Sequence, residues 1–241
     1  MKTEAWRLAP GGLEFTLAAG RLAGLGPDSL AVEAGCGMGL TAVELVKHFG
    51  CRVEAFDLFP DFISRAKRLA AVQGLSDRIN FCCADILRCL PAAEYCDFAA
   101  ADGGVLTAAA DREALLQLLS HALKPGGHLY LSDLAVHPWA PEPVSAYYRH
   151  LKTGSELLYR QLLPQLGLEI IFSCLLPDTA WRRYFCDINR AARRQAGFLK
   201  QPELAAKVRE EAAVYYRQGG RGSVDYLLIV ARKGCVGLKK G

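Results

Sequence analysis

The sequence predicts an α/β fold in which helices cover both faces of a mostly parallel sheet. Three observations support this prediction. Short apolar segments alternate with amphipathic segments through the first half of the chain, as expected when strand–helix units build a doubly wound sheet. An acid follows each of several apolar segments, and a glycine cluster separates the first segment from the helix after it. In such sheets, ligands bind beyond the carboxyl ends of the strands.

The glycine cluster lies in the segment AVEAGCGMGL, residues 31–40, where the first apolar run reaches Glu33. Glycines follow at every second position (Gly35, Gly37 and Gly39), and an amphipathic helix is expected from Thr41 to Phe49. Glycine permits positive φ angles and lets the backbone approach a ligand closely. The spacing departs from the Gly-x-Gly-x-x-Gly dinucleotide pattern, so the cluster by itself is also compatible with an ordinary turn.

The following apolar segments are expected to be strands whose ends carry acids. Residues 51–57 end at Asp57 and residues 78–85 at Asp85, while the strand 97–101 leads into Asp102. A turn at 124–127 precedes a fifth strand that runs to Asp133. A carboxylate at the tip of the second strand can accept hydrogen bonds from both ribose hydroxyls of a nucleoside ligand.

Helix signals separate these strands. A helix is expected to begin at Pro60 and Asp61 and to be closed by Gly74, and Asp111 is a suitable N-cap for another. We expect further elements on either side of this region: a helical segment at 6–25, a loop at 135–143, a helix at 155–167, a sixth strand at 168–175, a helical insertion at 180–219 and a last strand at 224–231.

Composition narrows the class of protein. A chain of 241 residues with 51% hydrophobic content predicts a single globular domain. We find no apolar stretch long enough for a membrane span and no signal-peptide core near the first residue, so a cytoplasmic protein is expected. Nine cysteines without a Cys-x-x-Cys pair predict buried free thiols, and five histidines without ligand spacing predict no metal site. A net charge of +4 does not require a nucleic acid partner.

With these motifs in place, the sequence resembles the class I S-adenosylmethionine-dependent methyltransferases. Residues 33–39 resemble the first motif of that family, and the Leu123–Leu129 turn resembles the one before its fifth strand. The nearest group is the small-molecule one that includes the ubiquinone and menaquinone methyltransferases. The resemblance implies a Rossmann-like, seven-stranded sheet whose last strand is antiparallel. It also implies one domain over 1–241, with an N-terminal helical cap (1–27), a cofactor-binding core (28–135) and an acceptor side (136–241).

The resemblance further implies that S-adenosylmethionine is the cofactor and S-adenosylhomocysteine the product. Asp57 would bind the ribose, Asp85 would lie near the adenine amino group, and Leu58 and Ile86 could cover the adenine faces. Glu33 could accept a hydrogen bond from the donor's amino group or brace the glycine loop. The residues expected at the cofactor are Glu33, Gly35, Cys36, Gly37, Asp57, Leu58, Asp85, Ile86 and Asp102.

Acceptor residues are expected in the less regular second half. His137 is the candidate general base if one is needed. Aromatic side chains could stack on the acceptor or shield the sulfonium, and arginines could bind a carboxylate or phosphate. The candidates are Trp139, Tyr147, Trp181, Arg182 and Tyr184.

The acceptor itself stays open between alternatives. A small molecule is favoured, whereas the basic helix 182–200 would suit RNA phosphates. An arsenite or metalloid acceptor would use Cys36, Cys174 and Cys186. A non-catalytic cofactor-binding sensor or partner subunit is the alternative from a different class. The sequence does not indicate an oligomeric state.

Overall fold

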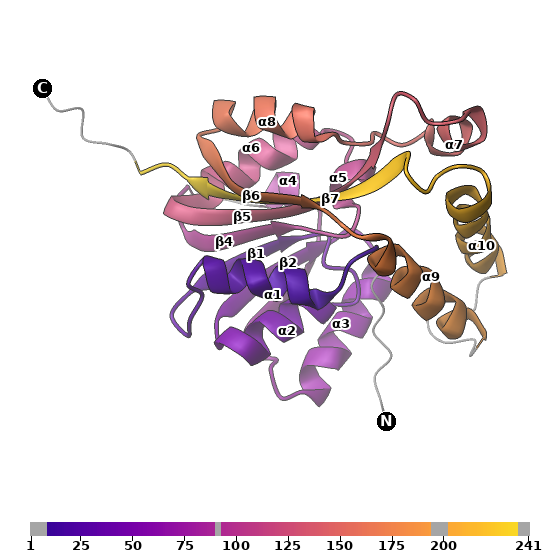
Figure 1. Ribbon diagram of the computed structural model, residues 1–241. Coiled ribbons are helices and arrows are strands. Elements are labelled where there is room, and N and C mark those ends of the chain that lie inside the picture. Colours follow the sequence, from indigo (N-terminus) through magenta and orange to yellow (C-terminus); the bar gives the residue numbers. More distant parts are fainter. Residues whose placement is uncertain (1–8, 90–92, 194–201, 236–241) are drawn as a thin grey trace, which may run out of the picture.

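The protein folds around one seven-stranded sheet. The structure, a computed structural model, describes residues 9–89, 93–193 and 202–235 (Figure 1). The strands are β1 (Leu30–Ala34), β2 (Arg52–Asp57), β3 (Ile79–Cys83), β4 (Cys96–Ala101), β5 (Leu123–Val136), β6 (Leu168–Leu175) and β7 (Val224–Lys233). Their spatial order is β3-β2-β1-β4-β5-β7-β6. Strands β1 to β5 pair in parallel, and β7 is antiparallel to both of its neighbours. The predicted fold class is confirmed.

Helices cover both faces of this sheet and its carboxyl end. The helices are α1 (Leu13–Leu22), α2 (Leu40–Phe49), α3 (Pro60–Val72), α4 (Ile86–Cys89), α5 (Val105–Ala108), α6 (Arg112–Ala122), α7 (Glu142–Tyr148), α8 (Glu156–Gln165), α9 (Asp178–Arg193) and α10 (Pro202–Arg217). In Figure 1, α1, α2 and α3 lie on one face, while α4, α6 and α8 lie on the other. Helices α7, α9 and α10 lie beyond the carboxyl ends of β5 and β6 (Figure 1).

The core has two apolar layers because successive strand residues point to opposite faces. On β5, Tyr130 and Leu134 belong to the layer under α1 to α3, whereas Leu129 and Leu131 belong to the layer under α6 and α8. The polar residues Ser132 and Asp133 continue this alternation, so one faces each layer. Both are fully buried, and both organise polar contacts described below.

Two predicted helix ends are confirmed by their caps. The Asp111 side chain accepts a hydrogen bond from the Ala114 amide at 2.9 Å and caps α6. Gly74 follows α3 with a φ of +69°, the left-handed conformation that a glycine after a helix supplies.

Other elements differ from the sequence-based expectations. β5 begins at Leu123, so the turn expected at 124–127 lies within the strand. Helix α7 lies partly within the loop expected at 135–143. In its described residues, the insertion expected at 180–219 consists mainly of α9, which already begins at Asp178, and α10. At the N-terminus the helix begins at Leu13; of the helical segment expected at 6–25, residues 6–8 lie outside the described part.

Two further expectations concern the cysteines, expected to be buried free thiols, and the absence of a membrane span. All nine cysteines are free thiols, but the expected burial is wrong for Cys83, Cys89, Cys186 and Cys235, which are exposed. Within the described ranges, no helix is both long and apolar enough to cross a membrane.

Gly39 is where the glycine loop packs most closely on the core. Its φ is +78°, and a Cβ atom there would lie 2.7 Å from the Cβ of Ala66 and 2.8 Å from the ring of Phe81. Gly74 has a similar φ of +69°, but nothing lies within 4 Å of the position a Cβ would take. Comparing substitutions at Gly39 and Gly74 therefore separates the effect of backbone strain, which both positions share, from steric conflict, which occurs only at Gly39.

We therefore expect Gly39→Ala to destabilise the fold more than Gly74→Ala. The left-handed conformation costs an alanine about 1–2 kcal/mol at either position, and overpacking adds about 1–3 kcal/mol at Gly39 alone. Urea unfolding of the two variants and the wild type measures the difference. Equal losses of unfolding free energy would contradict the close packing of the loop.

Candidate functional site

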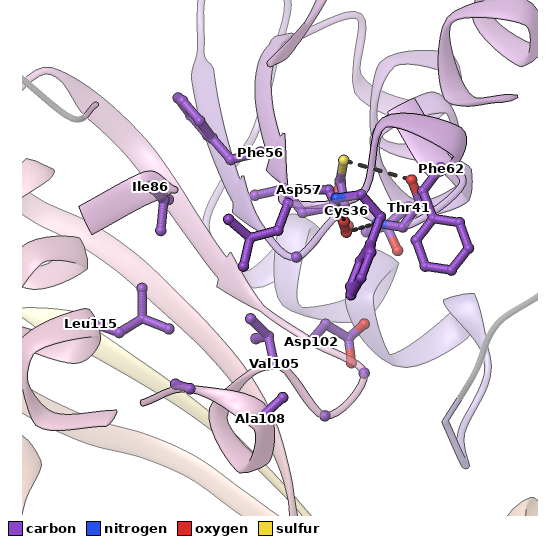
Figure 2. Close-up of a pocket in the computed structure, with 18 of the residues that line it drawn as sticks. Cys36, Thr41, Phe56, Asp57, Phe62, Ile86, Asp102, Val105, Ala108 and Leu115 are labelled. Atoms are coloured by element: carbon purple, nitrogen blue, oxygen red, sulfur yellow. Dashed lines mark hydrogen bonds between the residues drawn. The ribbon is translucent and has the colours of Figure 1, made fainter. Parts of the chain in front are cut away.

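A cavity of about 550 Å³ lies at the carboxyl ends of β1, β2, β3 and β4. Its walls come from the loops after these strands and from α5 and α6. Figure 2 shows Cys36, Thr41 and Asp57 on one side of the cavity and Val105, Ala108 and Leu115 on the other. All nine residues expected at the cofactor line this one cavity. A volume in this range suits a small-molecule ligand.

The glycine loop forms the cavity wall next to β1. Gly35, Gly37 and Gly39 have φ angles of 71°, 51° and 78°, which turn the chain sharply between β1 and α2. The amides of Gly35 and Cys36 both donate to the Phe56 carbonyl, at 2.8 and 2.9 Å. The loop is therefore held against the end of β2.

Asp57, at the end of β2, fixes the same loop with its side chain. One carboxylate oxygen accepts a hydrogen bond from the Gly37 amide at 2.8 Å, and the other accepts from the Phe59 amide at 3.0 Å. The side chain is partly exposed to the cavity. A carboxylate oxygen has more than one acceptor position, so these bonds leave capacity for two ribose hydroxyls.

An apolar part of the cavity lies beside Asp57. Leu58 is 63% exposed and Ile86 is buried, and both line the cavity. Asp85 accepts a hydrogen bond from the Leu87 amide at 3.0 Å, which orients its carboxylate at the start of α4. A flat heteroaromatic ring with an exocyclic amino group fits a space with two apolar side chains and one acceptor.

Two buried acids mark the other end of the cavity. Glu33 is 3% exposed and Asp102 is 6% exposed. The Ser132 hydroxyl donates to one Asp102 oxygen at 2.5 Å, and the Thr16 hydroxyl of α1 donates to the other at 3.1 Å. Negative charge at this end suits a ligand that carries an amino group or a sulfonium.

Sequence reasoning missed part of the cavity lining. Phe56, Phe59 and Leu87 adjoin motif acids, so proximity to the motifs could have indicated them. Val105, Ala108 and Leu115 come from α5 and α6, where no motif points to a ligand. Their contribution follows only from the way these helices cross the ends of the strands.

The six residues expected on the acceptor side do not line this cavity. Trp181 is only 1% exposed, and its ring stacks on Tyr215 with a centroid distance of 4.5 Å. Tyr147 donates a hydrogen bond to the Lys207 carbonyl at 3.4 Å. These aromatic side chains join α7, α9 and α10 into one layer.

His137 lies at the end of β5 in a pair with an acid. Its Nε2 is 2.5 Å from a carboxylate oxygen of Asp225. The imidazole stacks on Trp139 at 4.2 Å, and Trp139 is 69% exposed. Because neither ring reaches the cavity lining, the role of His137 as a general base stays a prediction.

Glu211 of α10 is the polar centre of the aromatic layer. Its carboxylate accepts hydrogen bonds from the hydroxyls of Tyr184 at 3.1 Å and Tyr148 at 3.4 Å. Burial raises the pKa of Glu211 above its usual value, although the two hydroxyls oppose this effect. One carboxylate thus connects the three helices beyond the sheet.

Three arginines of α9 have acidic partners. Arg183 pairs with Glu14 at 2.6 Å, Arg190 with Asp187 at 3.6 Å, and Arg182 with Asp178 at 3.9 Å. These pairs reduce the positive charge that the helix offers to phosphates. Residues 194–200 of the expected basic segment lie outside the described part.

The thiols named for a metalloid acceptor lie on separate elements. Cys36 is buried in the glycine loop, Cys174 is on β6, and Cys186 is on an exposed face of α9. Burial, with Glu33 nearby, raises the pKa of Cys36 far above its usual value and disfavours the thiolate. In the ranges that the structure describes, no three His, Cys, Asp or Glu side chains gather as a metal site would require.

The fold is Rossmann-like, and the cavity has the lining that a nucleoside cofactor would require. A family profile described as "Methyltransferase domain" matches residues 31–127. A sarcosine/dimethylglycine N-methyltransferase from Halorhodospira halochloris is 27% identical over 87% of this chain and 77% of its own length. A tRNA 5-carboxymethoxyuridine methyltransferase from Escherichia coli is 37% identical, but over 48% of this chain and 44% of its own length.

Solved methyltransferase structures share the fold of this chain. A geranyl diphosphate C-methyltransferase from Streptomyces coelicolor, crystallised with S-adenosyl-L-homocysteine, matches with a TM-score of 0.68 at 21% identity. The match covers 92% of this chain and 78% of that one. Among the curated relatives, the matched share of the relative's own length ranges from 30% to 78%. Residues 31–127 therefore match a methyltransferase domain, and the fold is that of the class I S-adenosylmethionine-dependent methyltransferases to which the chain is similar.

We expect Asp57→Ala to weaken the binding of S-adenosylhomocysteine by tenfold or more, which is about 1.4 kcal/mol. The substitution removes the proposed acceptor for the ribose hydroxyls and also releases the Gly37 amide. Calorimetric titration measures the dissociation constant. Asp61→Ala, at an exposed position in the first turn of α3, is the matched control and should bind like the wild type. Unchanged affinity of Asp57→Ala would exclude the proposed ribose contact.

Proposed function

We propose that this methyltransferase transfers a methyl group to a small-molecule acceptor held at the Glu33 and Asp102 end of the cavity. The observation that carries the proposal is the convergence of nine motif residues from four strand ends on one cavity. Bound there, S-adenosylmethionine supplies a methyl group that its sulfonium charge already activates. The protein must then hold donor and acceptor in line and exclude water.

Within this proposal, the cavity residues divide according to the part of the cofactor they bind. Asp57 binds the ribose hydroxyls, Asp85 accepts from the adenine amino group, and the side chains of Leu58 and Ile86 cover the adenine. Glu33 accepts from the amino group of the methionine part. Gly35, Cys36 and Gly37 contribute backbone rather than side-chain chemistry, and Asp102 faces the methionine part or the acceptor.

The surroundings of Asp102 favour a small acceptor. Thr16 of α1 closes over this carboxylate, and Ser132 lies beneath it with Tyr226 3.5 Å from the Ser132 hydroxyl. The aromatic layer of α7, α9 and α10 packs beyond the carboxyl end of β5 and the amino end of β7. A closed arrangement of this kind leaves less room for a polynucleotide than for a small molecule. The side chains expected on the acceptor side would then act by shaping this layer. They are Trp139, Tyr147, Trp181, Arg182 and Tyr184.

The relatives support the same preference. The relative named for sarcosine and dimethylglycine matches 87% of the chain, whereas the tRNA-modifying relative matches 48%. In addition, Arg182, Arg183 and Arg190 of α9 are already paired with carboxylates. We therefore favour a small molecule over RNA. Nine free thiols also suit a reducing compartment, and we propose a cytoplasmic location.

Methyl transfer from labelled S-adenosylmethionine tests the proposal directly. The purified protein is incubated with a panel of small amines, carboxylates and isoprenoid phosphates, and in parallel with bulk tRNA. We expect label in a small-molecule product and none in the RNA, and Asp57→Ala should lower the transfer.

Salt distinguishes the two acceptor classes further. For a small acceptor, transfer should change little between about 50 and 200 mM salt, since few phosphate contacts form. An RNA acceptor held by about six to ten phosphate contacts would lose binding by roughly 10³- to 10⁵-fold over the same range. Label in tRNA with this steep salt response would overturn the small-molecule proposal and leave the methyltransferase assignment intact.

A further inference from the structure

A buried carboxylate behind the cofactor cavity has no role in the function described so far. Asp133, near the carboxyl end of β5, is fully buried. One of its oxygens accepts hydrogen bonds from the Thr107 hydroxyl at 2.5 Å and the Leu134 amide at 2.9 Å. The other accepts from the Tyr159 hydroxyl at 2.5 Å and lies 3.2 Å from the Arg112 guanidinium. An acid buried in this way is stable only because its partners satisfy it.

The partners of Asp133 come from three separate helices. Thr107 belongs to α5, Arg112 opens α6, and Tyr159 lies on α8. Of these three helices, α5 and its flanking residues contribute most to the cavity. Val105 and Ala108 of α5 line it, as do Gly104 before the helix and Ala109 and Ala110 after it. Thr107 is itself 8% exposed and points away from the cavity into the core.

The same group extends to the segment after α7. Arg112 donates hydrogen bonds to the carbonyls of Lys152 and Thr153, and the Lys152 ammonium donates to the carbonyl of Ala110. Gly154 packs so closely that a Cβ atom there would lie 2.3 Å from an Asp133 oxygen. The cavity wall and the segment that follows the acceptor-side helix α7 are therefore fastened to one carboxylate.

Helix α5 has little stability of its own. The helix spans only four residues, Val105–Ala108, and an isolated helix of this length is not stable in water. The hydrogen bond from Thr107 is charge-assisted, which makes it stronger than a bond between neutral groups. It is thus the contact best suited to set the position of this short helix relative to the sheet.

We propose that Asp133 is a positioning residue that, through Thr107, holds α5 and the cavity wall at 104–110 in the geometry that binds S-adenosylmethionine. The inference rests on the proposed function, because it assumes that the cofactor occupies this cavity. Asp133 does not touch the cofactor in this scheme. Its effect is on the affinity for the cofactor and not on the transfer step.

Two nearly isosteric substitutions separate this role from general stability. Thr107→Val and Tyr159→Phe each remove one hydroxyl donor from Asp133, but only Thr107 belongs to α5, the helix whose residues Val105 and Ala108 line the cavity. We expect Thr107→Val to weaken S-adenosylhomocysteine binding at least about fivefold and Tyr159→Phe to change it less than about twofold, while both lower the melting temperature by a few degrees. Thr107→Ser keeps the hydroxyl and should restore the affinity.

Hydrogen exchange of the cofactor-free protein supplies a second measurement. Amides of residues 104–110 should exchange faster in Thr107→Val than in the wild type, whereas Tyr159→Phe should leave them unchanged. The positioning role is overturned if both variants weaken binding equally, or if Thr107→Val alters neither the affinity nor the exchange. Failure of the wild type to bind S-adenosylhomocysteine would instead reject the cofactor site, and the exchange measurement would still test the role of Thr107.

Discussion

The hydrogen bond from the Gly37 amide to the Asp57 carboxylate fixes the geometry on which the rest of the site depends. It joins the loop after β1 to the tip of β2 across 2.8 Å. Because β1 and β2 are parallel neighbours, their carboxyl ends meet at one edge. The hydrogen bond holds the glycine loop at that edge, where the loop forms one wall of the cavity. Glycine at the turn and aspartate at the strand end are therefore needed first for the shape of the cavity and only then for the ligand.

Sequence patterns could predict this edge well because its signals are local. The alternation of apolar and polar segments, the glycines at 35, 37 and 39, and the acids at strand ends are each readable within a few residues. The N-cap at Asp111 is equally local, since donor and acceptor are three residues apart. Where short-range chemistry decides a structure, the prediction and the structure agree.

The remaining features depend on contacts between distant segments. The placement of β7 between β5 and β6 follows from pairing across the whole second half of the chain. Asp133 accepts hydrogen bonds from Thr107 and Tyr159, each 26 residues away along the chain. No sequence motif marks Thr107 or Tyr159 as a partner of this acid. Trp181 illustrates the same limit: its residue type suits an acceptor stack, but its ring is packed against Tyr215. Aromatic residues in a variable segment do not reveal by themselves whether they line a site or fill a core.

The connection between β6 and β7 has a consequence for how this fold can diversify. Leu175 at the end of β6 lies opposite Leu227 on β7, so the chain leaves the sheet and returns to it between adjacent antiparallel strands. The segment between these points, which includes α9 and α10, is one long connection between two adjacent antiparallel strands. A connection whose two ends are neighbours in the sheet can be lengthened, shortened or exchanged without shifting the strands. The architecture thus lets the segment between β6 and β7 change in length and sequence independently of the strand ends that line the cavity.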